Sequence, residues 1–215
     1  MTASPRVLSR AELIADGVVH GLGVVASVVA VTVMIVLASV WQDGWTVLNI
    51  AIYGAGVVLV FAVSAIYNLW PPTPAKGVLR RFDHAFIFVK IAGTYTPFAA
   101  LAIGGATGAA LLAAVWGIAA VGVPLKLSGW RRFERISVAL YLVQGWLIVI
   151  AIGPLRESLD TAPLVLCVSG GVLYTVGVAF YLAERLPFHN AIWHGFVLAA
   201  SACMYAAVLD AVILG

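Results

Sequence analysis

The stretch 91–125 reads IAGTYTPFAALAIGGATGAALLAAVWGIAAVGVPL and contains no Asp, Glu, Lys or Arg. A helix needs about 20 apolar residues to cross the hydrocarbon core of a bilayer, which is roughly 30 Å thick. The stretch is therefore too long for one membrane span and long enough for two. The glycines in its middle, at 104–108 (GGATG), favour a turn. The stretch predicts two membrane-spanning helices joined by a tight connection.

The rest of the chain repeats this pattern. Five further uncharged runs cover residues 17–40, 44–70, 136–155, 161–183 and 191–209. Hydrophobic residues make up 63% of the chain and charged residues 10%, whereas soluble domains carry about 25% charged residues. We expect an all-α polytopic membrane protein, a single domain (1–215) that forms a seven-helix bundle. The approximate spans are 13–40, 45–70, 83–103, 108–127, 134–154, 162–183 and 190–213.

The basic residues between the spans are strongly biased to one side. That side holds Arg6, Arg10, Lys76, Arg80, Arg81, Lys126, Arg131, Arg132, Arg135 and Arg185, and the other side holds only Arg156. Because Lys and Arg accumulate in cytoplasmic loops, the N-terminus is predicted inside and the C-terminus outside. Basic residues at one membrane surface are expected to interact with anionic lipid. Nucleic-acid binding is not expected, because the chain has no soluble basic domain. We expect a multi-pass protein of the bacterial inner membrane.

Polar residues inside the spans gather in the half that this orientation makes cytoplasmic. They are Glu12, Asp16 and His20 on the first helix, Ser64 and Asn68 on the second, Asp83, His84 and Lys90 on the third, and His189, Asn190 and His194 on the seventh. Ionisable groups within a membrane are costly and usually functional. Four helices that place polar groups at a similar depth predict a polar pocket within the bundle.

Several of these residues also have an ordinary structural explanation. Glu12 and Asp16 lie near a helix N-terminus, where negative charge is favoured, and Asp83 would suit a helix cap. Lys90 is expected to face the bundle interior and pair with Asp83 or Asp16; the alternative is that its side chain extends along the helix toward water.

Four segments of the chain resemble known motifs. They are 12–23 (ELIADGVVHGLG), an acidic, histidine-bearing first segment; 64–68 (SAIYN), similar to a Ser-x-x-x-His motif; 81–84 (RFDH) with 91–97 (IAGTYTP), a third-helix signature; and 190–194 (NAIWH), similar to a His-x-x-x-His motif. Together they resemble the hemolysin III-like proteins, bacterial members of the progestin and adipoQ receptor superfamily. The resemblance implies a seven-helix bundle with the N-terminus inside.

The resemblance also implies a zinc site and a chemistry. In the family three histidines hold zinc, at positions that correspond here to Asn68, Asn190 and His194, and Ser64 and Asp83 match positions assigned to a metal-bound water. The superfamily is similar to metal-dependent lipid-amide hydrolases such as alkaline ceramidases. Two of the three ligand positions are asparagine in this chain, and a neutral amide is a poor zinc ligand. We therefore expect zinc to bind weakly or not at all.

Three other histidines are conceivable replacement ligands. His189 lies five residues from His194, about 140° around a helix, whereas a spacing of four residues would place both on one face. His189 would serve only if the helix begins irregularly. His20 and His84 come from positions that the family does not use for metal.

Three functions remain open at this stage. The first is a membrane protein whose pocket binds a lipid or another small amphiphile beside a degenerate zinc site. The second is a working zinc-dependent lipid-amide hydrolase, and therefore an enzyme, if a metal is retained. The third is a proton- or ion-coupled transporter with a relay through Asp16, His20, Asp83 and Lys90, which the lack of visible internal repeats disfavours.

Overall fold

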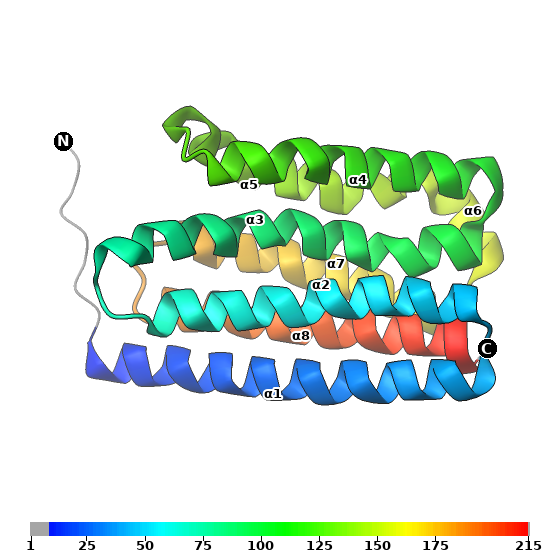
Figure 1. Cartoon of the computed structure of the whole chain (residues 1–215), viewed down its shortest axis with the longest axis horizontal. Helices are drawn as coiled ribbons and strands as arrows, with labels where there is room; N and C mark the ends of the chain where they lie inside the picture. Colours follow the sequence, from blue (N-terminus) through cyan, green and yellow to red (C-terminus); the bar gives the residue numbers. More distant parts are fainter. Residues whose placement is uncertain (1–8, 215) are drawn as a thin grey trace.

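The computed structural model describes residues 9–214, apart from the side chains of residues 131, 132, 134 and 135. The helices, shown in Figure 1, are α1 (Arg10–Trp41), α2 (Gly44–Leu69), α3 (Pro74–Pro97), α4 (Gly105–Leu127), α5 (Arg131–Trp146), α6 (Ile152–Ser158), α7 (Thr161–Leu182) and α8 (His189–Leu209). Short segments of altered helical pitch, η1 (Phe98–Ile103), η2 (Leu147–Ala151) and η3 (Asp210–Leu214), continue α3, α5 and α8.

Seven helical stretches in the described part of the chain are long and apolar enough to cross a membrane. The expected all-α, seven-helix class is therefore confirmed. The third stretch runs from Pro74 to Ile103 and begins nine residues before the predicted start at 83. Its first two turns hold Lys76 and Arg80, which made this segment look like a loop in the sequence. Proline at the first helical position has no N–H to satisfy and a backbone angle suited to helix initiation.

The predicted turn within 91–125 lies at Gly104 and Gly105. Both residues have positive φ angles, 62° and 55°, a conformation that glycine adopts without steric cost. The long uncharged stretch therefore folds back on itself, and α4 returns beside α3.

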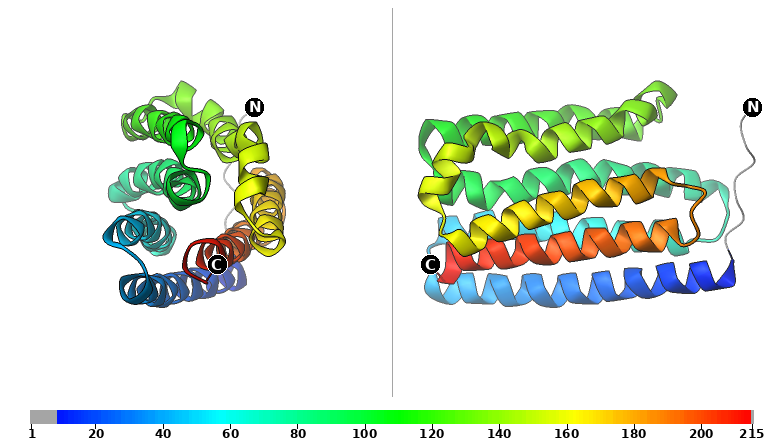
Figure 2. Two further views of the ribbon diagram at one scale, coloured as in Figure 1. Left: turned by 90° about the vertical axis from the view of Figure 1, so that its right-hand side faces the viewer. Right: turned by 180° about the vertical axis from the view of Figure 1, so that it is seen from behind.

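The helices form a ring rather than a solid bundle, as the end-on view in Figure 2 shows. In order around the ring, α1 contacts α2, α2 contacts α3, α3 contacts α5, α5 contacts α7, α7 contacts α8, and α8 closes on α1. The remaining long helix, α4, packs against α3 and α5. The interior of the ring is where a site would lie.

Two glycines bring α2 and α3 close together. A Cβ atom at Gly56 would lie 3.3 Å from the Cα atom of Lys90, and one at Gly93 would lie 3.3 Å from the carbonyl oxygen of Ile52. Small residues allow such close packing between membrane helices. The approach fixes the position of Lys90 on the inner wall of the ring.

The loops with most of the basic residues lie at one end of the bundle, which we call the basic end. The start of α1 and the connections α2–α3, α4–α5 and α7–α8 meet there (Figure 1). Arg6 lies outside the described residues. The cytoplasmic location of the basic end stays a prediction from charge.

Candidate functional site

The polar residues of α1 form one buried column at the basic end. Glu12, Asp16 and His20 are 4%, 7% and 2% exposed. Their spacing of four residues placed them on one helix face, and that face points into the bundle. The three residues nevertheless have different roles.

Glu12 caps two chain segments and does not line the central cavity. One of its carboxylate oxygens accepts a hydrogen bond from the backbone N–H of Ser9, 2.8 Å away, which completes a capping box at the start of α1. Its other oxygen accepts from the backbone N–H of Phe188, 2.9 Å away, just before α8 begins. Glu12 thus joins α1 to α8, a structural role for a residue that the sequence placed in the pocket.

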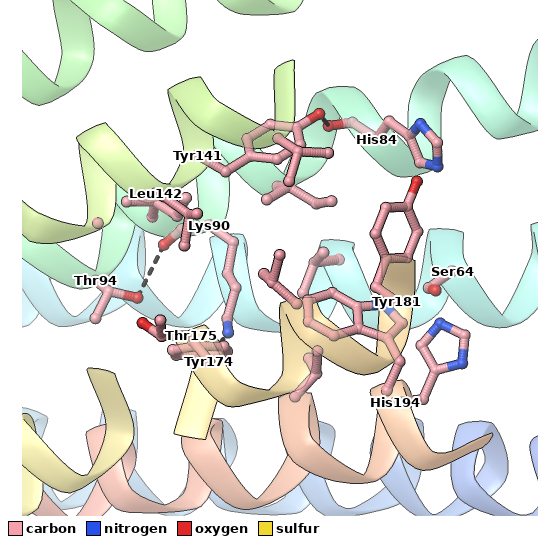
Figure 3. Close-up of a pocket in the computed structure, with 18 of the residues that line it drawn as sticks. Ser64, His84, Lys90, Thr94, Tyr141, Leu142, Tyr174, Thr175, Tyr181 and His194 are labelled. Atoms are coloured by element: carbon pink, nitrogen blue, oxygen red, sulfur yellow. Dashed lines mark hydrogen bonds between the residues drawn. The ribbon is translucent and has the colours of Figure 1, made fainter. Parts of the chain in front are cut away.

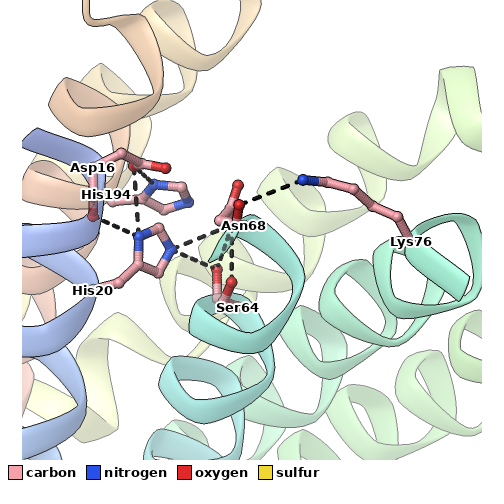
Figure 4. A network of polar contacts seen from close by, with 6 residues as sticks. All are labelled: Asp16, His20, Ser64, Asn68, Lys76 and His194. Atoms are coloured by element: carbon pink, nitrogen blue, oxygen red, sulfur yellow. Dashed lines mark hydrogen bonds and ion pairs between the residues drawn. The ribbon is translucent and has the colours of Figure 1, made fainter. Parts of the chain in front are cut away.

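Asp16 connects the two histidines of the site (Figure 4). Its carboxylate oxygen Oδ1 lies 2.7 Å from Nδ1 of His194 and 3.5 Å from Nδ1 of His20. The two imidazole rings meet edge to face, with centroids 4.2 Å apart. Residues from the first and the last helix therefore form one cluster.

Hydrogen bonds determine which nitrogen of His20 carries a proton. Nδ1 lies 2.8 Å from the backbone carbonyl oxygen of Asp16, and a carbonyl oxygen only accepts, so Nδ1 donates. In the neutral ring Nε2 then has a lone pair. That lone pair faces the Asn68 amide nitrogen at 3.2 Å and the Ser64 hydroxyl at 3.3 Å.

His194 also carries its proton on Nδ1, because Nδ1 donates to the carboxylate of Asp16. Its Nε2 has the lone pair when the ring is neutral. A histidine whose other nitrogen donates to a carboxylate or carbonyl is the usual form of a metal ligand. Both histidines are therefore oriented as metal ligands are.

Asp16, His20 and His194 each offer a donor atom within 4.8 Å of the other two. Two imidazoles and a carboxylate form a donor set that zinc accepts in catalytic sites. With Nδ1 of each histidine donating, a metal would bind the free Nε2 atoms of His20 on α1 and His194 on α8, and Asp16 would orient the His194 ring from its other side. From the sequence, Asp16 is a pocket residue only, whereas His20 is also a conceivable substitute ligand; the spacing of four residues is the signal that joins them.

Asn68 lies beside this cluster. Its amide nitrogen donates to His20 and also to the Ser64 hydroxyl and carbonyl oxygens, at 3.3 Å and 3.0 Å. An N–H group cannot bind a cation. Asn68 in this orientation satisfies the lone pair of His20.

A cavity of about 950 Å³ runs through the ring, within the usual range of ligand pockets. Figure 3 shows part of its wall, with Ser64 and His194 toward one side and Lys90 and Tyr174 toward the other. The cavity brings together nine of the predicted residues: His20, Ser64, Asn68, Asp83, His84, Lys90, His189, Asn190 and His194. The remaining lining is mostly apolar and aromatic, and none comes from α4.

Asp83 completes the polar end of the cavity, which we define as His20, Ser64, Asn68, Asp83 and His194. Asp83 is 8% exposed and lines the cavity together with Ser64 and His194. The polar end therefore draws side chains from α1, α2, α3 and α8.

His84 and His189 line the cavity away from the donor set. The His84 ring lies edge-on to Tyr181, with centroids 6.4 Å apart. His189 is the first residue of α8 and follows Phe188, whose φ is 61°, so the helix does begin with an unusual backbone turn. The His189 Nδ1 atom is buried and has no hydrogen-bond partner among the described residues.

Lys90 corrects the sequence prediction. Its side chain faces the interior and is 6% exposed, as expected, but the proposed pairing with Asp83 or Asp16 is wrong. Its ammonium donates instead to the hydroxyls of Tyr174 and Ser201. Neither hydroxyl was singled out in the sequence, because isolated Tyr and Ser residues within apolar spans carry no distinctive signal.

A family model described as haemolysin-III related matches residues 12–205. The chain belongs to the haemolysin-III family. It is 40% identical to the hemolysin-3 homolog of Bacillus subtilis (strain 168) over 198 residues, which cover 92% of this chain and 93% of that protein. It is 38% identical to hemolysin-3 of Bacillus cereus, over 92% of this chain and 90% of that protein.

Similarity extends to animal members of the wider superfamily. The monocyte to macrophage differentiation factor of Homo sapiens is 28% identical over 177 residues, which cover 78% of this chain and 71% of that protein. This haemolysin-III protein is therefore a member of the progestin and adipoQ receptor superfamily and a multi-pass protein of the bacterial cell membrane. No solved structure matches it.

Proposed function

We propose that this haemolysin-III protein binds one amphiphile inside its helix ring. The observation behind the proposal is the cavity of about 950 Å³, which has polar groups at the basic end and apolar side chains along most of its wall. Apolar lining with a few convergent polar groups is typical of ligand sites. A molecule with a hydrocarbon chain and a polar group matches that distribution.

The experiment places a large side chain in the cavity at a glycine whose Cβ position is not in contact with other atoms. Gly171 on α7 lines the cavity, and a Cβ atom there would meet no atom within 4 Å. Gly171→Trp should therefore fold and occupy the space of the ligand. Gly117 on α4 also has nothing within 4 Å of its Cβ position but does not line the cavity. Gly117→Trp is the matched control.

The probe is hexadecanol with a photoreactive diazirine on its chain, added to purified protein in detergent. Cross-links mapped by mass spectrometry should fall on cavity residues such as Leu142 of α5 and Val178 of α7. They should disappear in Gly171→Trp and persist in Gly117→Trp. Labelling confined to outward residues such as Val25 and Val29, which are exposed, would exclude an internal ligand.

A second candidate function is that of a zinc-dependent lipid-amide hydrolase, and the Asp16, His20 and His194 donor set favours it. Bound zinc would supply a water whose pKa is lowered to about 7. Around it, Asp16 would orient the His194 ring, and Ser64 and Asp83 would face the substrate from the polar end of the cavity. The cavity would exclude bulk water from an acyl chain.

Metal analysis separates the two candidates. Protein purified without chelator and dialysed against a mild chelator is analysed by mass spectrometry for metals. About one zinc per chain, lost in His20→Ala and His194→Ala, would favour the hydrolase. Protein free of zinc that still captures the diazirine probe would leave amphiphile binding as the function.

A further inference from the structure

Among the residues that the structure describes, Lys90 is a buried basic side chain that donates hydrogen bonds only to neutral groups. Its ammonium donates to Tyr174 and Ser201, and its nitrogen lies 4.0 Å from the centre of the Tyr174 ring. Among the described residues, no carboxylate forms an ion pair with it. A buried charge without a counter-charge is costly in a membrane.

The two hydroxyls have no hydrogen left to donate elsewhere. Ser201 donates its hydrogen to the carbonyl oxygen of Val197, 2.7 Å away. The contact of 2.8 Å between Tyr174 and Ser201 therefore uses the tyrosine hydrogen. Both oxygens can only accept from Lys90, and neither brings a negative charge.

An ammonium has three N–H donors, and these contacts use two. Lys90 and Tyr174 both line the cavity. The third N–H donor of Lys90 and its unbalanced charge are therefore available to a molecule in the cavity. Figure 3 shows the Lys90 side chain meeting the Tyr174 ring there. An acceptor with one negative charge in the cavity would satisfy both the donor and the charge.

The position of Lys90 indicates how such a ligand would lie. It follows Asp83 by seven residues, about 10 Å along α3, and is therefore separate from the Asp16–His20–His194 cluster. Beyond it, away from the basic end, the lining becomes apolar (Phe98, Ile148, Ile152, Leu155 and Leu164). Phe98 is eight residues, about 12 Å, further along the helix. A hydrocarbon tail fits that end.

We propose that Lys90, held in place by Tyr174 and Ser201, is a carboxylate-binding site, at which a long-chain acid is held with its head on Lys90 and its tail toward the apolar end of the cavity. The inference rests on the proposed amphiphile binding and specifies its ligand class. A carboxylate matches the single positive charge, whereas a phosphate monoester carries up to two negative charges. A charge-assisted hydrogen bond in a dry site supplies the selectivity.

The test compares radiolabelled hexadecanoate with hexadecanol, which has the same chain length and no charge, by equilibrium binding in one detergent. The unmodified protein should bind hexadecanoate at least about tenfold more tightly, as expected for a hydrogen bond to a charged group. Lys90→Met should remove that preference and leave the affinity for hexadecanol unchanged. Retained hexadecanol binding also reports that the variant is folded.

Lys76 gives the matched control, because it also lines the cavity but donates to the backbone carbonyls of Trp70 and Asn68 at its basic end. Lys76→Met should bind both ligands as the unmodified protein does. If Lys90→Met does not fold, Lys90→Gln removes the charge with a polar side chain and should give the same loss of preference.

Equal affinity of the unmodified protein for the acid and the alcohol would overturn the carboxylate site and leave amphiphile binding intact. An equal loss of affinity for both ligands in folded Lys90→Met would also overturn the carboxylate site. Failure of the unmodified protein to bind either ligand would refute the proposed function itself, and the carboxylate site with it.

Discussion

The Nδ1 atom of His194 lies 2.7 Å from the carboxylate oxygen of Asp16, although 178 positions separate the two residues in the chain. The contact joins the first helix of the ring to the last and orients an imidazole whose free nitrogen is directed away from the carboxylate. His20, four residues after Asp16, adds a second imidazole that also carries its proton on Nδ1. This arrangement makes specific predictions about metal binding.

Asp16→Asn should weaken zinc binding by about 10–100-fold, the usual effect of losing a group that orients or joins a metal site. Zinc affinity is measured by competition with a chromogenic chelator on purified protein. Glu12→Gln is the control, since Glu12 is buried one turn earlier on the same face but serves as a cap. Equal loss of zinc in both variants would show that the whole α1 face, and not the cluster, determines the affinity.

Asn68→His combined with Asn190→His should raise zinc affinity by orders of magnitude. Both positions line the cavity with His194, and Asn68 contacts His20 directly, so the change adds imidazole donors beside an existing pair. The same chelator competition measures it. Asn49→His, on α2 but outside the cavity, should gain nothing. A folded double variant without increased affinity would mean that positions 68 and 190 do not converge on one ion.

Gly108→Ala should lower the free energy of unfolding by about 1–3 kcal/mol, the typical cost of overpacking. A Cβ atom at Gly108 would overlap the carbonyl oxygen of Ala99, where α4 packs against η1. Gly117→Ala in the same helix meets nothing within 4 Å and should be neutral or slightly stabilising, because alanine favours helix. Unfolding in a detergent–denaturant titration compares the two. Equal stability of the variants would contradict the packing at Gly108.

The N-terminus should be cytoplasmic and the C-terminus external, because ten of the basic residues outside the spans lie on one side and one on the other. Reporter fusions at each end measure this. A fluorescent protein that matures only in the cytoplasm should be active at the N-terminus, and an alkaline phosphatase that is active only outside should be active at the C-terminus. The reverse pattern would place the polar end of the cavity at the outer surface.

The sequence by itself determined the membrane class of this protein, its helix count and the turn at Gly104–Gly105. These follow from local physics, since an uncharged run of about 20 residues must be helical in lipid to satisfy its own backbone. The buried face of α1 was also readable, because residues four apart share a helix face. The start of α3 could not be predicted from the sequence, because Lys76 and Arg80 on its first two turns are typical of a loop between membrane spans.

Only the tertiary structure decided which polar groups meet. By resemblance, the sequence predicts a zinc site at Asn68, Asn190 and His194, and this stays a prediction; that His194 meets Asp16 and His20 is seen only in the folded chain. The sequence also predicted that Lys90 pairs with a carboxylate. In the structure, Lys90 donates instead to the hydroxyls of Tyr174 and Ser201. The helical period fixes which side of a helix a residue occupies. The neighbour across the interior depends on how seven helices close into a ring, and that is a property of long-range packing.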